Sequence, residues 1–147
     1  MGNEKTVRIG IIGCGGIANG KHMPSLRQIP GVQMVAFCDI IEERARKAKQ
    51  DYGTPDAAVY TDYRKLLEDK TIDVVHVCTP NRAHSFITVD ALHAGKHVMC
   101  EKPMAINAAE AKKMLDAAKE TGKLLTIGYQ SRQRADAQYM KQECLAG

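Results

Sequence analysis

The stretch VRIGIIGCGGIA, residues 7–18, places a glycine-rich turn directly after a run of apolar residues. Such a nearly continuous apolar run is typical of a parallel strand that is buried on both faces. The turn has the pattern G-x-G-x-x-A, with Gly13, Gly15 and Ala18 at the fixed positions. This pattern is informative when it connects a strand to a helix, and the sequence predicts that context here.

Each fixed position has a physical role if the turn binds a pyrophosphate. Gly13 permits the tight turn, Gly15 lets the backbone approach the phosphates without a Cβ in the way, and Ala18 keeps helix and strand close. Backbone N–H groups at the start of the helix then face the anion. The residues of the turn predicted to bind a dinucleotide are Gly13, Gly15, Gly16 and Ile17. The alternative is a glycine turn that binds nothing.

A carboxylate ends the second predicted strand, about 20 residues after the turn. Asp39 is at the position whose side chain hydrogen-bonds the ribose hydroxyls of adenosine and repels a 2′-phosphate. Ile40 and Ile41 follow it, and no arginine occurs before Arg44. We therefore expect NAD as the cofactor and regard NADP as the less favoured possibility. A second role for Asp39, compatible with the first, is the N-cap of the next helix.

Apolar runs alternate with helix-like segments along the whole chain. The predicted strands are Val7–Ile12, Val32–Cys38, Ala57–Tyr60, Val74–Cys78, His97–Cys100 and Leu124–Gly128. The predicted helices include Glu42–Tyr52, a short one capped by Asp62, Ala83–Ala94, one between Asn107 and Gly122 with an apolar stripe of Ala111, Met114, Leu115 and Ala118, and Ala135–Leu145. Right-handed crossovers convert this alternation into a doubly wound α/β sheet of six parallel strands, ordered 3-2-1-4-5-6.

Two polar motifs follow the fourth and fifth predicted strands, at the edge of the sheet where ligands bind. Thr79-Pro80-Asn81 offers two polar groups on a loop stiffened by proline, and His84 begins the next helix. We expect all four residues to contact the cofactor. The alternatives are a turn or cap role for Asn81 and a surface or capping role for His84.

The second motif, Glu101-Lys102-Pro103, puts an acid and a base at the end of a buried strand. Its place beyond the switch point of the sheet predicts a position at the nicotinamide end of the site. Lys102 can donate a proton or a hydrogen bond to a substrate oxygen there, and Glu101 is expected to contact the cofactor. The alternative is a Glu–Lys pair on the surface.

Composition argues against several other classes. The chain has 147 residues, 44% of them hydrophobic, which suits one soluble domain with a core. A net charge of +4 without a long basic run, with two Phe and no Trp, gives no case for nucleic acid. No apolar run reaches the roughly 20 residues of a membrane helix. Five cysteines without a CxxC pair predict reduced thiols in a cytoplasmic protein.

The histidines do not form a recognisable metal motif. Gly95 separates His93 from His97, so the two do not share a helical face. His22 and His76 have no partner by spacing. We therefore expect no metal site.

Taken together, the motifs resemble the N-terminal domain of the glucose–fructose oxidoreductase, inositol dehydrogenase and MocA-like family, a Rossmann fold. The matching stretches are residues 7–18, CTPNRAH at 78–84, EKP at 101–103 and GYQSR at 128–132. The resemblance implies an NAD(P)-dependent dehydrogenase or reductase that acts on CH–OH groups of sugars, inositols or related polyols. It also implies a catalytic role for Lys102, a position near the cofactor or substrate for Gln130, and a Lys102–Pro103 bond that is often cis.

The family has a second α/β domain that supplies substrate contacts and a motif with an Asp and a catalytic His. No residue of this chain can be assigned to that motif. We therefore expect residues 1–128 to form the dinucleotide-binding domain and residues 129–147 to begin the substrate domain. Alone, such a piece is expected to be a monomer without turnover, whereas the whole protein is expected to be a homo-oligomer. The alternatives are a non-enzymatic NAD-binding sensor or regulatory module, and a family reductase with a non-sugar substrate.

Overall fold

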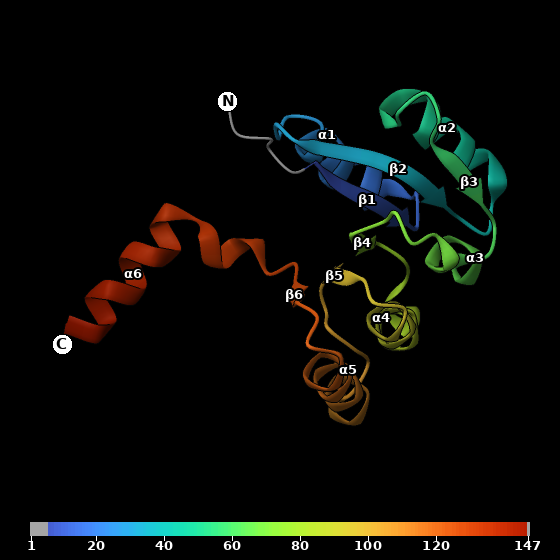
Figure 1. Ribbon diagram of the computed structural model, residues 1–147. Helices are drawn as coiled ribbons and strands as arrows, with labels where there is room; N and C mark the ends of the chain where they lie inside the picture. Colours follow the sequence, from blue (N-terminus) through green and yellow to red (C-terminus); the bar gives the residue numbers. More distant parts are fainter. Residues whose placement is uncertain (1–5, 147) are drawn as a thin grey trace.

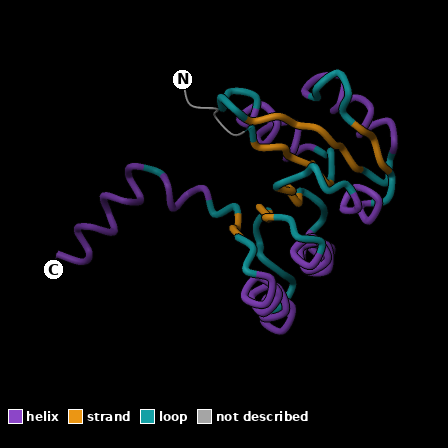
Figure 2. The backbone as a smooth tube through the Cα atoms, in the orientation of Figure 1, coloured by secondary structure: helices purple, strands orange, loops and turns teal. Residues whose placement is uncertain are grey.

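The computed structural model describes residues 6–146 and contains one parallel sheet with helices on both faces. The strands are β1 (Val7–Ile12), β2 (Val32–Cys38), β3 (Ala58–Tyr60), β4 (Val74–Val77), β5 (His97–Cys100) and β6 (Leu125–Ile127). All neighbouring strands run parallel, in the order β3-β2-β1-β4-β5-β6 (Figures 1 and 2). The predicted fold class and strand order are confirmed.

The helical segments divide between the two faces of the sheet. They are η1 (Ala18–His22), α1 (Met23–Leu26), α2 (Glu42–Tyr52), α3 (Tyr63–Glu68), η2 (Asn81–Ala83), α4 (His84–His93), α5 (Ala108–Thr121), η3 (Gln130–Gln133) and α6 (Ala135–Ala146). Buried residues of η1, α1 and α2 pack into one core cluster, whereas those of α3, α4 and α5 pack into the other. None of the described helices is long and apolar enough to cross a membrane.

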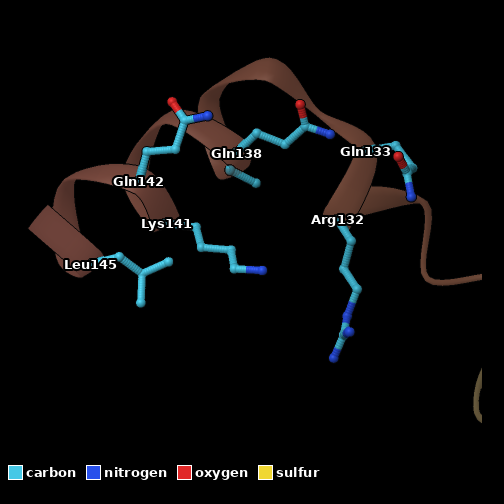
Figure 3. A pocket seen from close by; sticks show the side chains of 7 residues that line it. Arg132, Gln133, Gln138, Lys141, Gln142 and Leu145 are labelled. Carbon is cyan, nitrogen blue, oxygen red and sulfur yellow. The ribbon is translucent and has the colours of Figure 1, made fainter.

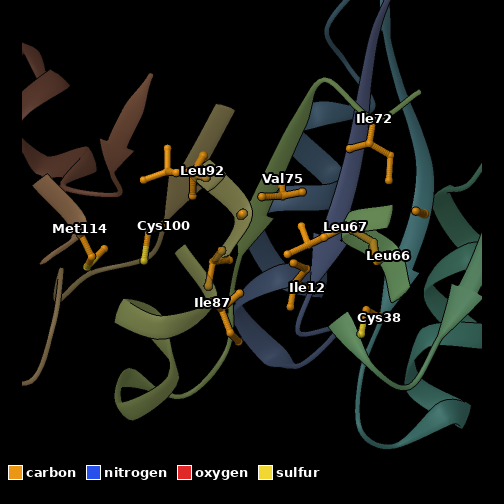
Figure 4. Close-up of a cluster of buried hydrophobic side chains, with 14 of the residues drawn as sticks. Ile12, Cys38, Leu66, Leu67, Ile72, Val75, Ile87, Leu92, Cys100 and Met114 are labelled. Atoms are coloured by element: carbon orange, nitrogen blue, oxygen red, sulfur yellow. The ribbon is translucent and has the colours of Figure 1, made fainter. Parts of the chain in front are cut away.

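Alternation of side chains along the strands builds both clusters at once. In β1, for example, Ile11 belongs to the cluster under α1 and α2, whereas Ile12 belongs to the cluster under α3 to α5. Figure 4 shows the second cluster, in which Val75 of β4 lies between Ile12 and Leu92 of α4. Each fully buried side chain of this size contributes roughly 1.5–3 kcal/mol, so both clusters hold the strand ends in place.

The segment after the glycine turn differs from the single helix that the sequence predicts. Residues Ala18–His22 form a π-helical turn, in which the N–H of Met23 donates to the carbonyl of Ala18, and α1 follows. Pro24 lies in the first turn of α1 and supplies no N–H to a regular ladder. Single π turns of this kind often occur at functional sites, and this one places His22 in the interior.

Helix α6 extends away from the sheet and the other helices (Figure 1). It has no buried residue, and neither has η3. Among residues 6–146, the last buried residue is Gly128, directly after β6. Within the described residues, the core therefore ends directly after β6.

Candidate functional site

The carboxyl ends of the strands lie along one edge of the sheet, and hydrogen bonds join the segments that follow them. The backbone bonds run from Gly13 N to Cys38 O, from Cys78 N to Ile12 O, from Glu101 N to Val77 O and from Gly128 N to Cys100 O, at 2.8–3.0 Å. The glycine turn, Asp39, the Thr79 loop and the Glu101 loop therefore follow neighbouring strands at one edge. Sheets of this type bind ligands in the crevice at that edge.

The two fixed glycines of the turn are required for different reasons. Gly13 has φ +91°, and a Cβ there would lie 2.8 Å from the carbonyl carbon and oxygen of Cys78. A Cβ at Gly15 or Gly16 would meet no atom within 4 Å. The fold itself thus excludes a side chain at Gly13, whereas the backbone at Gly15 and Gly16 is bare and open to a ligand. This arrangement fits the close approach of a pyrophosphate.

Asp39 is bonded to the glycine turn through its side chain. Its Oδ2 accepts a 2.9 Å hydrogen bond from Cys14 N, and its Oδ1 accepts one of 2.9 Å from Ile41 N. The residue is 8% exposed, and Ile40 beside it is 89% exposed. Ile41 is the N-cap of α2, so the N-cap role considered for Asp39 is wrong: the carboxylate caps a turn before the helix. Each oxygen retains a lone pair for a hydroxyl donor.

The Thr79 loop has an unsatisfied polar atom. Thr79 Oγ1 is buried and has no hydrogen-bond partner within residues 6–146. Because an unpaired buried hydroxyl is costly, a ligand group that bonds it would be stabilised. Pro80 and Asn81 are exposed, and Asn81 begins η2 without making a side-chain cap.

His84 joins the Thr79 loop to the Glu101 loop. Its Nδ1 lies 2.7 Å from the carbonyl oxygen of Pro103 and its Nε2 lies 2.8 Å from that of Thr79. A carbonyl only accepts, so a neutral ring satisfies one contact and a protonated ring satisfies both. The side chain is 1% exposed, and the surface role considered for it is therefore wrong. Both ring nitrogens are occupied by the protein, which leaves neither for a polar contact with a cofactor.

Glu101 and Lys102 point in different directions. Glu101 is 7% exposed, and its Oε2 accepts a 2.9 Å hydrogen bond from the backbone N–H of Lys102. The Lys102 side chain is exposed and makes no ion pair within the described part of the chain. The alternative of a Glu–Lys surface pair is thus wrong. The Lys102–Pro103 bond is cis, as the resemblance implies.

The sequence did not predict the partners of Glu101. Its Oε1 accepts a 2.8 Å hydrogen bond from His22 Nε2, and His22 Nδ1 lies 3.0 Å from His76 Nδ1. Burial lowers the pKa of His76 to about 4, so this ring is neutral at pH 7. The contacts span 79 and 54 positions, and no spacing rule detects them. Residues 6–146 contain no group of three side chains that could hold a metal ion.

The buried thiols are poor nucleophiles. Burial is the main cause that raises the pKa of Cys14 and Cys38 to about 12 and that of Cys100 to about 11. A thiol at such a pKa is protonated at neutral pH. Cys14 therefore contributes its backbone N–H, and no thiolate chemistry, to the glycine turn.

A hollow lies away from this edge of the sheet. A hollow of about 780 Å³ follows η3 and α6 and is lined mainly by polar side chains, among them Arg132, Gln138 and Lys141 (Figure 3). Gln130, exposed at the start of η3, is not among the lining residues. None of the lining residues belongs to the motifs at the sheet edge.

Comparison with known proteins gives a consistent result. Residues 7–129 match the model of a family described as an oxidoreductase family with the NAD-binding Rossmann fold. Inositol 2-dehydrogenase from Salmonella typhimurium is 38% identical over 128 residues, which are 86% of this chain and 38% of that protein. The chain spans about two fifths of the length of the curated relatives it matches.

Solved structures that are similar over 97% of this chain include two ligand complexes. One is KijD10, a 3-ketoreductase from Actinomadura kijaniata in complex with TDP-benzene and NADP, with a TM-score of 0.88, 27% identity and 44% of its own chain covered. The other is the WlbA dehydrogenase from Bordetella pertussis in complex with NADH and UDP-GlcNAcA, with a TM-score of 0.89, 27% identity and 40% covered. With its strand order, its glycine turn and its family match, this chain belongs to the oxidoreductase family that has the NAD-binding Rossmann fold.

Proposed function

We propose that the chain supplies the cofactor site of an NAD-dependent dehydrogenase or reductase that acts on a CH–OH group of a sugar, inositol or related polyol. The hydrogen bond from Cys14 N to Asp39 Oδ2 carries the proposal, because it fixes the ribose-binding carboxylate against the turn that faces the pyrophosphate. The inositol and glucoside dehydrogenases among the relatives support this substrate class.

The dinucleotide would lie along the sheet edge. Backbone N–H groups of the turn, from Gly13 to Ile17, would bind the pyrophosphate, and Asp39 would bind the adenosine ribose. Thr79 and Asn81 would line the middle of the site. When bound, the cofactor supplies a nicotinamide that accepts or donates a hydride.

Lys102 is the residue of this chain that we assign to the chemistry. Its exposed ammonium can hydrogen-bond a substrate oxygen and give or take its proton as the carbon gains or loses hydride. The buried Glu101 carboxylate accepts a hydrogen bond from the Lys102 backbone N–H, and this bond fixes the backbone position from which the Lys102 side chain extends. A sensor or regulatory module would have no need for such an ionisable group at the nicotinamide end. We also propose that Gln130 lies near the same end of the site.

We further propose that the dinucleotide-binding domain ends at residue 128 and that residues 129–147 begin a substrate domain. The lack of buried residues in η3 and α6 supports this boundary. The remaining acid or base, the substrate pocket and the contacts of a homo-oligomer would then be supplied outside these residues. Residues 1–147 alone should bind cofactor without turnover.

Calorimetric titration with NADH and, separately, NADPH tests the proposal. We expect NADH to bind with a dissociation constant in the micromolar to millimolar range and NADPH to bind more weakly, because its 2′-phosphate meets the Asp39 carboxylate. Equal or tighter binding of NADPH would show that our interpretation of Asp39 is wrong. The absence of binding by either dinucleotide would contradict the proposed site.

A further inference from the structure

A hydrogen-bonded chain of three side chains, two of them buried and that of His76 half-buried, lies next to the Lys102 loop. It runs from His76 in β4, through His22 at the end of η1, to Glu101 after β5. His22 and Glu101 are 8% and 7% exposed. The two imidazole rings are perpendicular, with centroids 5.3 Å apart. Three elements of the fold are thus connected by side chains at the edge where the dinucleotide would bind.

The directions of the hydrogen bonds follow from the chemistry of the partners. A carboxylate only accepts, and Glu101 already accepts from the N–H of Lys102, so His22 donates its Nε2 proton to the other oxygen. One proton then lies between the two Nδ1 atoms. Because burial keeps the pKa of His76 near 4, its neutral ring either donates that proton or accepts it from a protonated His22. No member of the chain loses a hydrogen bond in either arrangement.

Few other side chains could take the place of His22 as a hydrogen-bond donor to Glu101. No Lys or Arg side chain of the described residues pairs with Glu101, so His22 is its side-chain donor. A Cβ at Gly128 would lie 3.2 Å from Glu101 Oε1, so the residue directly after β6 also approaches this carboxylate closely. Removal of the His22 donor would leave a buried carboxylate with one partner fewer, and the carboxylate would move or take up a proton.

We propose that His22 and His76 are positioning residues that hold the Glu101 carboxylate, and through it the Lys102 backbone, in place for the nicotinamide half of the cofactor. The inference rests on the proposed function. His22 also lies on the π turn that starts behind the glycine turn, so the chain connects the pyrophosphate end of the site to the nicotinamide end. The adenosine half depends on Asp39, which the chain does not contact.

This division of roles predicts a selective effect on ligand binding. In His22→Phe the ring volume is kept and both polar atoms are lost. We expect the affinity for NADH to fall about tenfold, the factor that matches loss of one hydrogen bond to a charged group. The affinity for ADP-ribose, which lacks nicotinamide, should stay within about twofold, since its contacts lie on the side of Asp39. A merely structural role would change both affinities alike, or neither.

Two further variants make the test sharper. His22→Gln keeps an N–H donor near the position of Nε2 and should restore most of the NADH affinity. His93→Gln is the matched control, because it removes an exposed histidine that pairs with Glu120 on α5, and it should bind both ligands as the unchanged protein does. Equal NADH affinity in His22→Phe and the unchanged protein would overturn the proposal while the dinucleotide site stands.

Nuclear magnetic resonance tests the chain without any cofactor. In ¹⁵N-labelled protein we expect a scalar coupling across the Nδ1–H···Nδ1 hydrogen bond and a protonated Nε2 on His22. Both signals should vanish in His22→Phe, and the coupling alone in His76→Phe. If these signals are present but the protein does not bind NADH, the proposed function is contradicted, whereas the hydrogen bonds between His76, His22 and Glu101 are supported. Signals of two independent, solvent-exchanging rings would overturn the chain itself.

Discussion

The carboxylate of Asp39 accepts a 2.9 Å hydrogen bond from the backbone N–H of Cys14, so the residue after β2 holds the turn that follows β1. Its other oxygen accepts from Ile41 N at 2.9 Å. The carboxylate is therefore fixed before any ligand arrives, and little side-chain entropy remains to be lost on binding a ribose. The same bonds make Asp39 part of the fold as well as part of the site.

Replacement of Asp39 by Asn separates these two roles. The amide keeps one acceptor oxygen but presents an NH₂ group to the second backbone N–H, so we expect a loss of about 1–3 kcal/mol in unfolding free energy. NADH affinity should fall at least about tenfold, and the preference for NADH over NADPH should disappear because the 2′-phosphate no longer meets a negative charge. Urea denaturation and calorimetry measure the two effects. Asp116→Asn, on the exposed face of α5, should change neither. Retained NADH preference in Asp39→Asn would contradict the assignment.

The glycine turn allows a matched pair of substitutions. Gly13→Ala places a Cβ 2.8 Å from the Cys78 backbone at φ +91°, so we expect a loss of at least about 2 kcal/mol in unfolding free energy. Gly15→Ala meets no atom within 4 Å, and its stability should change by less than about 0.5–1 kcal/mol. Its NADH affinity should nevertheless fall at least about tenfold, since the new methyl group occupies the space for the phosphates.

Thermal denaturation and NADH titration of both variants check the pair. A Gly15→Ala protein that is stable and binds NADH normally would show that the open face of the turn is not the phosphate site. A Gly13→Ala protein of unchanged stability would show that the turn can relax.

The five cysteines should differ sharply in reactivity. Cys144 is exposed on α6, whereas the other four are buried. Burial and the Asp39 carboxylate both raise the pKa of Cys14, so alkylation of its thiol must wait for the protein to open. We expect iodoacetamide to modify one thiol rapidly in the native protein and all five in urea, as measured by mass spectrometry. Cys144→Ser should abolish the rapid phase, and a rapid reaction that persists in this variant would contradict the burial of the other four thiols.

Much of the fold could be predicted because local signals agree with the global structure. Strands β1 and β2 have the predicted ends, since a continuous apolar run between polar turns leaves little choice of boundary. The Asn107 side chain caps α5 by accepting from Glu110 N, and Gly122 ends that helix at φ +65°, so α5 lies between these two residues as predicted. These features depend on residues that are neighbours in sequence.

Features that depend on packing between distant segments were predicted poorly. The stripe assigned to α5 included Leu115, which is 46% exposed, and omitted Ala117, which is 3% exposed. Periodicity predicts how wide the apolar stripe of α5 is, but the position of α4 decides which edge of this stripe is buried. A small residue such as Ala117 permits the two helices to pack more closely. The pairing of His22 with Glu101 joins residues 79 positions apart, and only the topology of the sheet brings them together.

Stability in mild acid should depend on His76. An unfolded histidine takes up a proton near pH 6.5, whereas burial lowers the pKa of His76 in the folded protein to about 4. Between these pH values the unfolded chain binds more protons, so His76 makes the unfolding free energy fall as the pH falls through this window, by up to about 1.4 kcal/mol per pH unit. Above pH 6.5 the ring is neutral in both states and contributes no pH dependence.

Urea denaturation between pH 4 and 8 measures this effect. The unfolding free energy should depend less steeply on pH in His76→Phe than in the unchanged protein, whereas exposed His93→Gln should keep the original dependence. Identical slopes for His76→Phe and the unchanged protein would contradict this prediction. They would mean that the pKa of His76 is the same in the folded and the unfolded protein, near 6.5.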